Sequence, residues 1–220
     1  MNNEINEINE INEMNTRINN EICYNTIADL RDDKLICEYM GSKSVKNEIK
    51  KLEYILDKYI SNEIKEKIIF YYLLELIPAG TKGVIRGNKF NNIVKLKLLE
   101  LNLNSDRYEL SFEKKCELYL TSEIPDWYIL DKLSNKILIG MNQLDIWNGG
   151  QQLNRGFKYI ENNKHNNENS KLLCVVCNKI QFTTNKNKAF KLFKIGFENN
   201  TLCYLNNLIN IIKSYFIIKD

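Results

Sequence analysis

The chain of 220 residues is long enough to bury one sizeable core, and its 44% hydrophobic and 27% charged residues are ordinary for a globular protein. A formal net charge of +3 gives only weak support for a polyanionic partner. Six scattered cysteines and a single histidine argue against a secreted disulfide scaffold and a zinc site. No signal peptide and no apolar run of roughly 18 residues is present, so we expect a soluble cytoplasmic protein without a membrane span.

Residues 1–25 contain the three-residue repeat NEINEINEINEMN. Ile8, Ile11, Met14, Ile18 and Ile22 fall within one sector of a helix, which favours an amphipathic helix, and a frayed low-complexity tail is the alternative. We expect residues 26–220 to form a single domain.

Helical periodicity runs from Val45 to Ile77 and ends at Pro78. The segment AGTKGVIRGNK, residues 79–89, is predicted to be a basic, glycine-punctuated connection before a second helix that Asn88 caps. The pattern then changes to strands at ELSFEKK, WYILD and KILIGMNQLDIW, followed by a helix, the apolar strand KLLCVVCNKIQF and a closing helix. This order predicts an α/β fold with a mixed central sheet flanked by helices.

Three polar side chains mark the hairpin formed by the second and third predicted strands. Asp126 follows Pro125 at the start of WYILD, and Gln143 and Asp145 project side by side from the end of the next strand. Converging oxygen ligands suit Mg²⁺, which can activate water beside a phosphate, and Glu113 and Glu123 are further carboxylates within reach. The alternative is a solvated strand end with an incidental acid.

A segment rich in amides and cations follows. Gly149 and Gly150 precede a helix whose N-terminus favours an anion, although an ordinary loop-to-helix turn explains the same pair. Side chains suited to bases and phosphates come next: Gln151, Gln152, Asn154, Arg155 and Lys158. The connection 79–89 adds Lys82, Arg86 and Lys89, with a solvated connector as the alternative; it is not a Walker A loop, since it lacks the Gly-Lys-Ser/Thr ending.

The runs RGNKFNNIV, EIPDWYI and IGMNQLDIWNGGQQLNRGFKY resemble a type II restriction endonuclease of the PD-(D/E)xK superfamily, over residues 75–210. The resemblance implies a mixed sheet flanked by helices, Mg²⁺-dependent hydrolysis of double-stranded DNA and a homodimer on a palindromic site. It makes Asp126 the Pro-Asp metal ligand. The second half of the motif departs from the family: the chain offers Gln143-Leu144-Asp145 or, less plausibly, Gly140-Met141-Asn142, and neither contains the usual lysine.

The first hypothesis is therefore a sequence-specific endodeoxyribonuclease. In it Asp126 and Asp145 hold Mg²⁺ with their carboxylates about 4–7 Å apart, Gln143 positions the water or the metal, and Glu113 is an outer acid. Lys82, Arg86, Arg155 and Lys158 are expected on the side of the molecule that carries Asp126. The rival hypothesis is a non-catalytic DNA-binding module on the same fold, and a structural interaction protein is a third possibility.

Overall fold

The structure is a computed structural model that describes residues 23–31, 33–119, 123–146, 150–160, 165–177 and 188–218. Contacts divide the chain into two compact units, a helical unit of residues 27–88 and an α/β unit of residues 1–26 and 89–220. The sequence had suggested one domain over residues 26–220. The repeat of residues 1–22, where an amphipathic helix was considered, lies outside the described residues.

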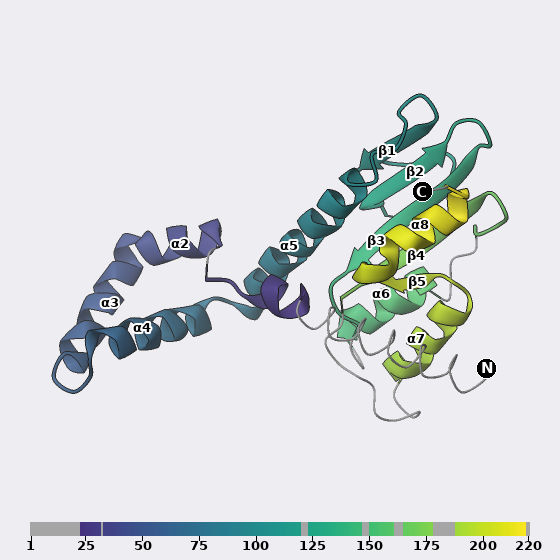
Figure 1. Cartoon of the computed structure of the whole chain (residues 1–220). Helices are drawn as coiled ribbons and strands as arrows, with labels where there is room; N and C mark the ends of the chain where they lie inside the picture. Colours follow the sequence, from purple (N-terminus) through teal and green to yellow (C-terminus); the bar gives the residue numbers. More distant parts are fainter. Residues whose placement is uncertain are drawn as a thin grey trace, which may run out of the picture. The chain divides into compact units, whose positions relative to one another are not determined.

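The helical unit contains α2 (Lys34–Gly41), α3 (Lys43–Leu56), α4 (Asn62–Leu76) and the first part of α5 (Ala79–Leu99) (Figure 1). Asp33 and Ser42 accept hydrogen bonds from backbone N–H groups in the first turns of α2 and α3, and so cap these helices. Val45 on α3 packs with Ile69 and Leu73 on α4, which joins the two helices through one apolar cluster. The helical pattern predicted from Val45 to Ile77 is thus confirmed, with a break between Leu56 and Asn62.

The segment 79–89, predicted to be a connection, is helical instead, and α5 runs unbroken from Ala79 to Leu99. Its glycines at 80, 83 and 87 each weaken a helix by about 1 kcal/mol relative to alanine, which is why the sequence looked like a loop. Burial outweighs that cost. Ile85 is buried in the helical unit, and Phe90, Val94 and Leu98 are buried at four-residue spacing in the α/β unit.

The α/β unit is built on a five-stranded sheet in the order β1-β2-β3-β4-β5. Its strands are β1 (Tyr108–Phe112), β2 (Trp127–Asp131), β3 (Lys136–Gln143), β4 (Ser170–Val176) and β5 (Leu202–Tyr204). The first three strands are antiparallel neighbours, and β3, β4 and β5 are parallel. The helices α6 (Gly150–Ile160) and α7 (Lys188–Glu198) connect the parallel strands, and α8 (Leu208–Phe216) follows the 3₁₀ turn η1 (Leu205–Asn207). The predicted mixed sheet flanked by helices is confirmed.

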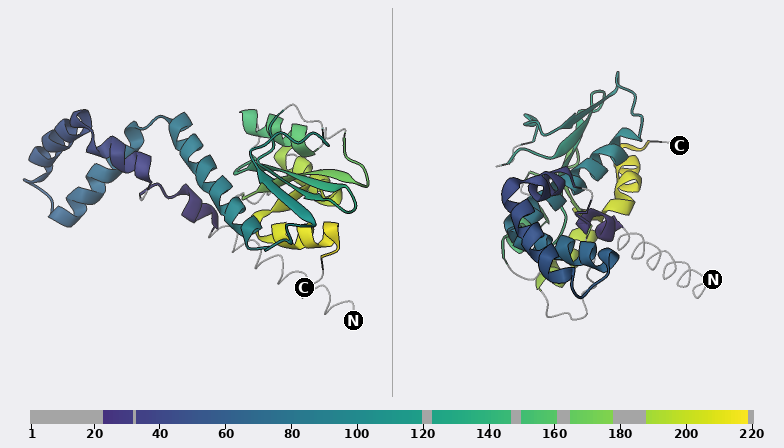
Figure 2. Two further views of the ribbon diagram at one scale, coloured as in Figure 1. Left: turned by 90° about the horizontal axis from the view of Figure 1, so that it is seen from above. Right: turned by 90° about the vertical axis from the view of Figure 1, so that its left-hand side faces the viewer.

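The two faces of the sheet carry different layers. Ile137, Ile139 and Met141 of β3 lie in one apolar cluster with residues of α6 and α7, such as Leu153 and Leu192. Figure 2 shows α6 and α8 on opposite sides of the sheet. Strand alternation turns Leu138, Gly140 and Asn142 away from the α6 side. There the indole of Trp127 lies so close to Gly140 that an added Cβ would meet its Cε2 atom at 1.8 Å.

Among the described residues, no single helix has the length and apolar character needed to cross a bilayer. Only α4 and α5 taken together pass that test of length and composition, and they are bent by 101° at the break between them.

Candidate active site

The β2–β3 hairpin determines which residue lies beside Asp126. Asp131 pairs with Lys136 and Trp127 with Gly140, so a four-residue turn at 132–135 sets the register. The backbone N–H of Asp126 continues this pairing by donating to the Gly140 carbonyl at 3.1 Å, and its carbonyl accepts from the Glu113 N–H at 3.0 Å. Asp126 therefore lies between β1 and the Gly140–Asn142 segment of β3.

Two donors hold the Asp126 carboxylate. Its Oδ2 accepts from the backbone N–H of Asn142 at 2.6 Å, and its Oδ1 accepts from Asn91 Nδ2 of α5 at 3.2 Å. Asn91 Oδ1 in turn accepts from Asn142 Nδ2 at 3.1 Å, and Asn142 Oδ1 accepts from Trp127 Nε1 at 3.1 Å. The side-chain bonds run in one direction, from the indole through the two amides to the carboxylate. The orientation of Asp126 is thus determined by two strands and a helix.

A cavity of about 290 Å³ opens beside this network. Its walls come from α5, the end of β1 and the β2–β3 pair, and the lining residues are Asn91, Asn92, Lys95, Phe112, Glu113, Asp126, Trp127 and Asn142. Lys95 Nζ lies 5.1 Å from the centre of the Phe112 ring, a cation–π distance. Glu113 has a positive φ of 50°, a backbone conformation that costs energy for a residue other than glycine. The cavity therefore combines two carboxylates, a lysine and three amides.

The Asp126 carboxylate is electrostatically unusual. Burial raises its pKa above the ordinary value, the hydrogen bonds from Asn142 and Asn91 oppose that rise, and the charges of Glu113 and Glu123 add to it. A raised pKa in a polar cavity, with like charges nearby, is common at functional sites and also occurs in structural networks. The raised pKa also indicates that Glu113 and Glu123 lie close enough to Asp126 for their charges to affect its ionisation.

Glu123 connects this site to α6. Its Oε1 accepts from Lys158 Nζ at 2.6 Å, and its Oε2 accepts from the Tyr159 hydroxyl. Burial opposes ionisation of Glu123, but these two hydrogen bonds keep its pKa below the ordinary value. Burial and the Glu123 carboxylate raise the pKa of Tyr159, and the charge of Asp126 contributes to that rise. Lys158, predicted to contact DNA, therefore pairs with Glu123, a carboxylate whose charge also affects Asp126.

Gln143 and Asp145, the partners predicted for Asp126 on β3, have contacts of their own in the structure, and their approach to Asp126 stays a prediction. Gln143 is buried at the end of β3, where its Nε2 donates to the Asp145 carbonyl at 3.1 Å. Asp145 Oδ2 accepts a hydrogen bond from the Tyr24 hydroxyl at 3.3 Å. Burial raises the pKa of the Cys177 thiol, and the negative charge of Asp145 adds to that rise. The hairpin register sets which position of β3 lies beside Asp126. Asp126 lies level with position 141, and position 145 would be about 13 Å further along an extended strand.

The predicted DNA-binding residues are distributed over both units. Gly150 begins α6, Asn154 and Arg155 are exposed on it, and Gly149 and the side chains of Gln151 and Gln152 lie outside the described residues. Lys89 is half-buried on α5 in the α/β unit. Lys82 and Arg86 belong to the helical unit, where Lys82 Nζ lies 3.7 Å from Glu75 Oε2. Their predicted placement on the side of Asp126 stays a prediction.

Sequence reasoning missed the contribution of α5 and named Asn142 only within the less favoured alternative for the second half of the motif. Asn91 directly follows the buried Phe90, and Lys95 directly follows the buried Val94. A polar residue next to the apolar stripe of a helix lies at the border of its buried face, which was the available signal. Gly140-Met141-Asn142, the less favoured alternative, is the segment that adjoins Asp126.

The donor atoms around the cavity suit a hard cation. Each Asp126 oxygen accepts one hydrogen bond described above and retains a further lone pair, and Glu113 adds a second carboxylate. Across the part of the chain that the structure describes, no group of three or more His, Cys, Asp or Glu residues is arranged to hold a metal ion. Mg²⁺ is often bound through one or two carboxylates, with water and substrate phosphate as the remaining ligands. The residues present fit Mg²⁺ on those terms.

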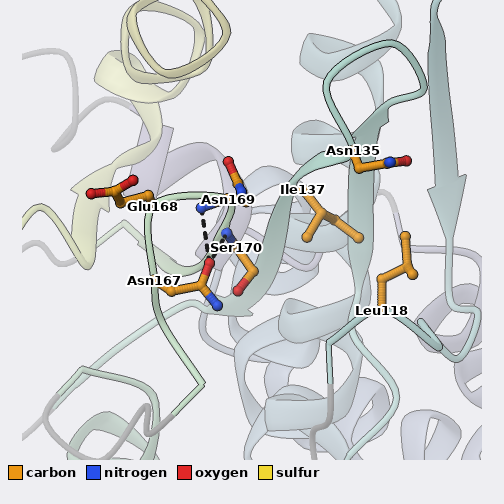
Figure 3. A pocket seen from close by; sticks show the side chains of 7 residues that line it. All are labelled: Leu118, Asn135, Ile137, Asn167, Glu168, Asn169 and Ser170. Carbon is orange, nitrogen blue, oxygen red and sulfur yellow. Dashed lines mark hydrogen bonds between the residues drawn. The ribbon is translucent and has the colours of Figure 1, made fainter.

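A second, larger cavity of about 520 Å³ lies where β3 and β4 begin, with Asn135, Asn167, Glu168, Asn169 and Ser170 among its lining residues (Figure 3). Asn167 Oδ1 accepts from the backbone N–H groups of Asn169 and Ser170, at 2.8 Å each, so this amide shapes its own loop (Figure 3). Glu168 is the only acidic or basic side chain among its lining residues. The chemically richer cavity is the one at Asp126. Neither a protein-family model nor a curated protein matches the chain in sequence.

Proposed function

We propose that the protein is a Mg²⁺-dependent endodeoxyribonuclease that hydrolyses phosphodiester bonds of double-stranded DNA, on a restriction-endonuclease-like fold and as a homodimer. One observation carries this proposal. The oriented, half-buried Asp126 carboxylate shares a cavity with a second carboxylate, Glu113, and with Lys95. A dianionic pocket with a cation at its wall suits a phosphodiester that arrives with a metal ion.

Each residue of the cavity has a separate role in this proposal. Asp126 and Glu113 hold the metal, which when bound supplies an activated water and neutralises charge on the scissile phosphate. Asn91 and the Asn142 N–H stabilise the ionised form of Asp126 and point it into the cavity. Lys95 donates to a non-bridging phosphate oxygen as negative charge develops there. Because only two carboxylates contribute, we expect metal affinity to rise when DNA supplies the remaining oxygen ligand.

The resemblance stated above calls for a lysine on β3, and this chain has Asn142 in the adjoining segment. Asn142 cannot supply a positive charge, and its side chain is already engaged by Trp127 and Asn91. Lys95 reaches the same cavity from α5 and is the cation among its lining residues. We therefore assign to Lys95 the electrostatic role that β3 does not provide.

A non-catalytic DNA-binding module is the second candidate. Two observations favour it. Among the described residues, no three or more His, Cys, Asp or Glu side chains are grouped so that they could hold a metal ion, and the segment 140–145 contains no lysine. In that case Asp126 is a structural carboxylate that joins α5 to the hairpin. The two candidates share DNA as a partner and differ in whether a phosphodiester bond is cut.

The deciding experiment incubates the purified full chain with supercoiled plasmids of diverse sequence, in Mg²⁺, in Mn²⁺ and in EDTA. The proposed nuclease nicks or linearises DNA only with a divalent ion, and Asp126→Asn lowers the rate by about a hundredfold or more while it retains DNA binding. Asp145→Asn distinguishes a metal site formed by Asp126 and Glu113 from one formed by Asp126 and Asp145. We expect this variant to cleave within a few-fold of the wild-type rate. A wild-type chain that binds DNA tightly with either ion and never nicks it supports the binding module.

A further inference from the structure

Three lysines on the exposed side of α3, and a fourth just after the end of that helix, lie in the helical unit. Lys43, Lys46 and Lys50 share with Tyr54 a sector of roughly 80° on this helix, and Lys58 Nζ lies 5.1 Å from the centre of the Tyr54 ring. All five side chains are exposed. We call this set the lysine face.

The opposite side of α3 forms the core of the helical unit. Val45 is buried there, and Ile49, Leu52 and Leu56 pack beside it against the cluster that contains Ile69 and Leu73 of α4. The fold therefore turns the lysine face outward, and its lysines on α3 span about 10 Å of the helix axis, from Lys43 to Lys50.

The lysine face lacks acidic partners. Among the described residues, none of Lys43, Lys46, Lys50 and Lys58 takes part in an ion pair. Asp57, at the end of α3, pairs with Lys65 at 2.6 Å. Glu53, three residues after Lys50, forms no ion pair with these lysines among the described residues. Most other described lysines of this unit have such a partner, so the lysine face is a local concentration of uncompensated positive charge in a chain whose net charge is only +3.

This arrangement works against the helix in isolation. Lys43 and Lys46 stand three residues apart and Lys46 and Lys50 four, so neighbouring like charges repel. The first turn of α3 contains no acid, although negative charge is what stabilises that end of a helix. An anionic partner would relieve both effects.

We propose that the lysine face of α3 binds the phosphate backbone of double-stranded DNA. A duplex carries about one negative charge per 1.7 Å of axis, so the roughly 10 Å between Lys43 and Lys50 corresponds to about six phosphates counted over both strands. Tyr54 and Asn47 add neutral donors of the kind that contact phosphate oxygens. The partner is the DNA of the proposed function, but these residues are separate from the cavity at Asp126.

A membrane surface fits this face less well. Helices that lie on anionic bilayers insert an apolar face between the lipids while their cations contact the headgroups. The apolar face of α3 is already packed against α4, and the lysine face contains a single aromatic residue. Contact through charge alone, as with a DNA backbone, leaves the helical unit intact.

The test measures binding of the full chain to a fluorescent duplex in EDTA, by anisotropy, between about 50 and about 200 mM salt. The variant changes Lys43, Lys46 and Lys50 together to glutamine. The matched control changes Lys34, Lys67 and Lys194 to glutamine, which removes the same charge from exposed lysines that have acidic partners four residues away. A third variant changes Lys43, Lys46 and Lys50 to arginine and keeps the charge.

Loss of three phosphate contacts should make the slope of log K against log salt shallower by about 2.7, while the control changes it by less than about 1. The arginine variant should keep the wild-type slope, which excludes a folding defect. Equal losses in the variant and the control overturn the inference, as does lysine-dependent binding to phosphatidylserine vesicles with unchanged DNA binding. A chain that binds through these lysines and never cuts overturns only the proposed function, and one that cuts with an unchanged slope overturns only this inference.

Discussion

Asn91 of α5 donates a hydrogen bond to Asp126 across 3.2 Å, and 35 residues of chain separate the two. The bond joins the helix that precedes the sheet to the loop that enters β2. It also acts on charge, because it stabilises the ionised form of a carboxylate that burial tends to neutralise. The acidity of the candidate site therefore depends on a helix that contributes no acid to it.

Replacing Asn91 by alanine should shift the acid limb of the pH–rate profile for DNA cleavage to higher pH. Hydrogen bonds to charged groups are worth about 1.5–3 kcal/mol, so the pKa of Asp126 should rise by about one unit or more. The carboxylate then takes up its proton at a higher pH and loses the metal there. Asn92→Ala, which alters the neighbouring residue of the same cavity, is the control and should leave the profile in place. Identical profiles for the wild type and Asn91→Ala contradict the assigned role.

Replacing Lys95 by methionine should lower the cleavage rate by about tenfold to a hundredfold at saturating DNA, since a charged donor to the developing phosphate charge is lost. Lys97→Met removes the same charge two residues along α5 and should have little effect. Single-turnover rates measure the chemical step, and an anisotropy titration shows whether DNA binding has changed. Equal rates for Lys95→Met and Lys97→Met would count against a role in the cavity.

Two glycine substitutions should change stability in opposite directions. An alanine Cβ at position 140 would overlap the Trp127 indole, so Gly140→Ala should lower the free energy of unfolding by about 3 kcal/mol. At Gly83 no atom lies within 4 Å of an added Cβ, and Gly83→Ala should stabilise α5 by about 0.5–1 kcal/mol. Urea denaturation followed by circular dichroism measures both. If Gly140→Ala left the free energy of unfolding unchanged, the Trp127 indole could move away from β3 without cost, contrary to this prediction.

The ion pair of Asp131 and Arg107 should make stability depend on pH. Arg107 donates to the buried Asp131 carboxylate at 2.8 Å, and this bond with the Leu133 N–H lowers the pKa of Asp131 to about 2. A folded-state pKa below the unfolded value of about 3.9 contributes stability above that value, which is lost as pH falls through the folded pKa. Asp131→Asn should cost about 1–3 kcal/mol at pH 7. The difference from wild type should shrink in denaturation curves recorded between about pH 4 and 2, and a difference that persists there contradicts the pairing.

Local sequence patterns were sufficient for most of the elements around the site. Alternating residues located β1, β2 and β3, because strand period follows from the backbone alone, although β1 and β3 end earlier than predicted, at Phe112 and Gln143. The continuous apolar run LLCVV marked the central β4, since a strand covered on both faces has no polar side. The pattern failed at residues 79–89, where three glycines weaken the local helix signal and burial of Ile85 together with Phe90 compensates.

The composition of the candidate site could be predicted only in part. Asp126 and Glu113 stood out as acids beside a hairpin, and the structure places both at one cavity. The partner of Asp126 on β3 depends on register, which places Asp126 opposite Met141, two residues before Gln143 and four before Asp145. The predicted strands leave the turn 132–135 that the structure has, but β3 ends at Gln143 and not at Trp147, so the alternation that placed Gln143 and Asp145 side by side does not extend to Asp145.

The sequence by itself determined the strands, the fold class and the presence of acids near the hairpin, since each follows from periodicity and short-range connection. Tertiary structure alone decided that Asn91 and Lys95 reach the cavity, that Asp145 contacts Tyr24, and that Lys43, Lys46 and Lys50 of α3 face outward without an ion pair among the described residues. The physical reason is that these contacts join residues whose separation along the chain carries no periodic signal. They form because burial of Phe90, Val94 and Leu98 holds α5 in the α/β unit, and burial of Val45 against α4 orients α3.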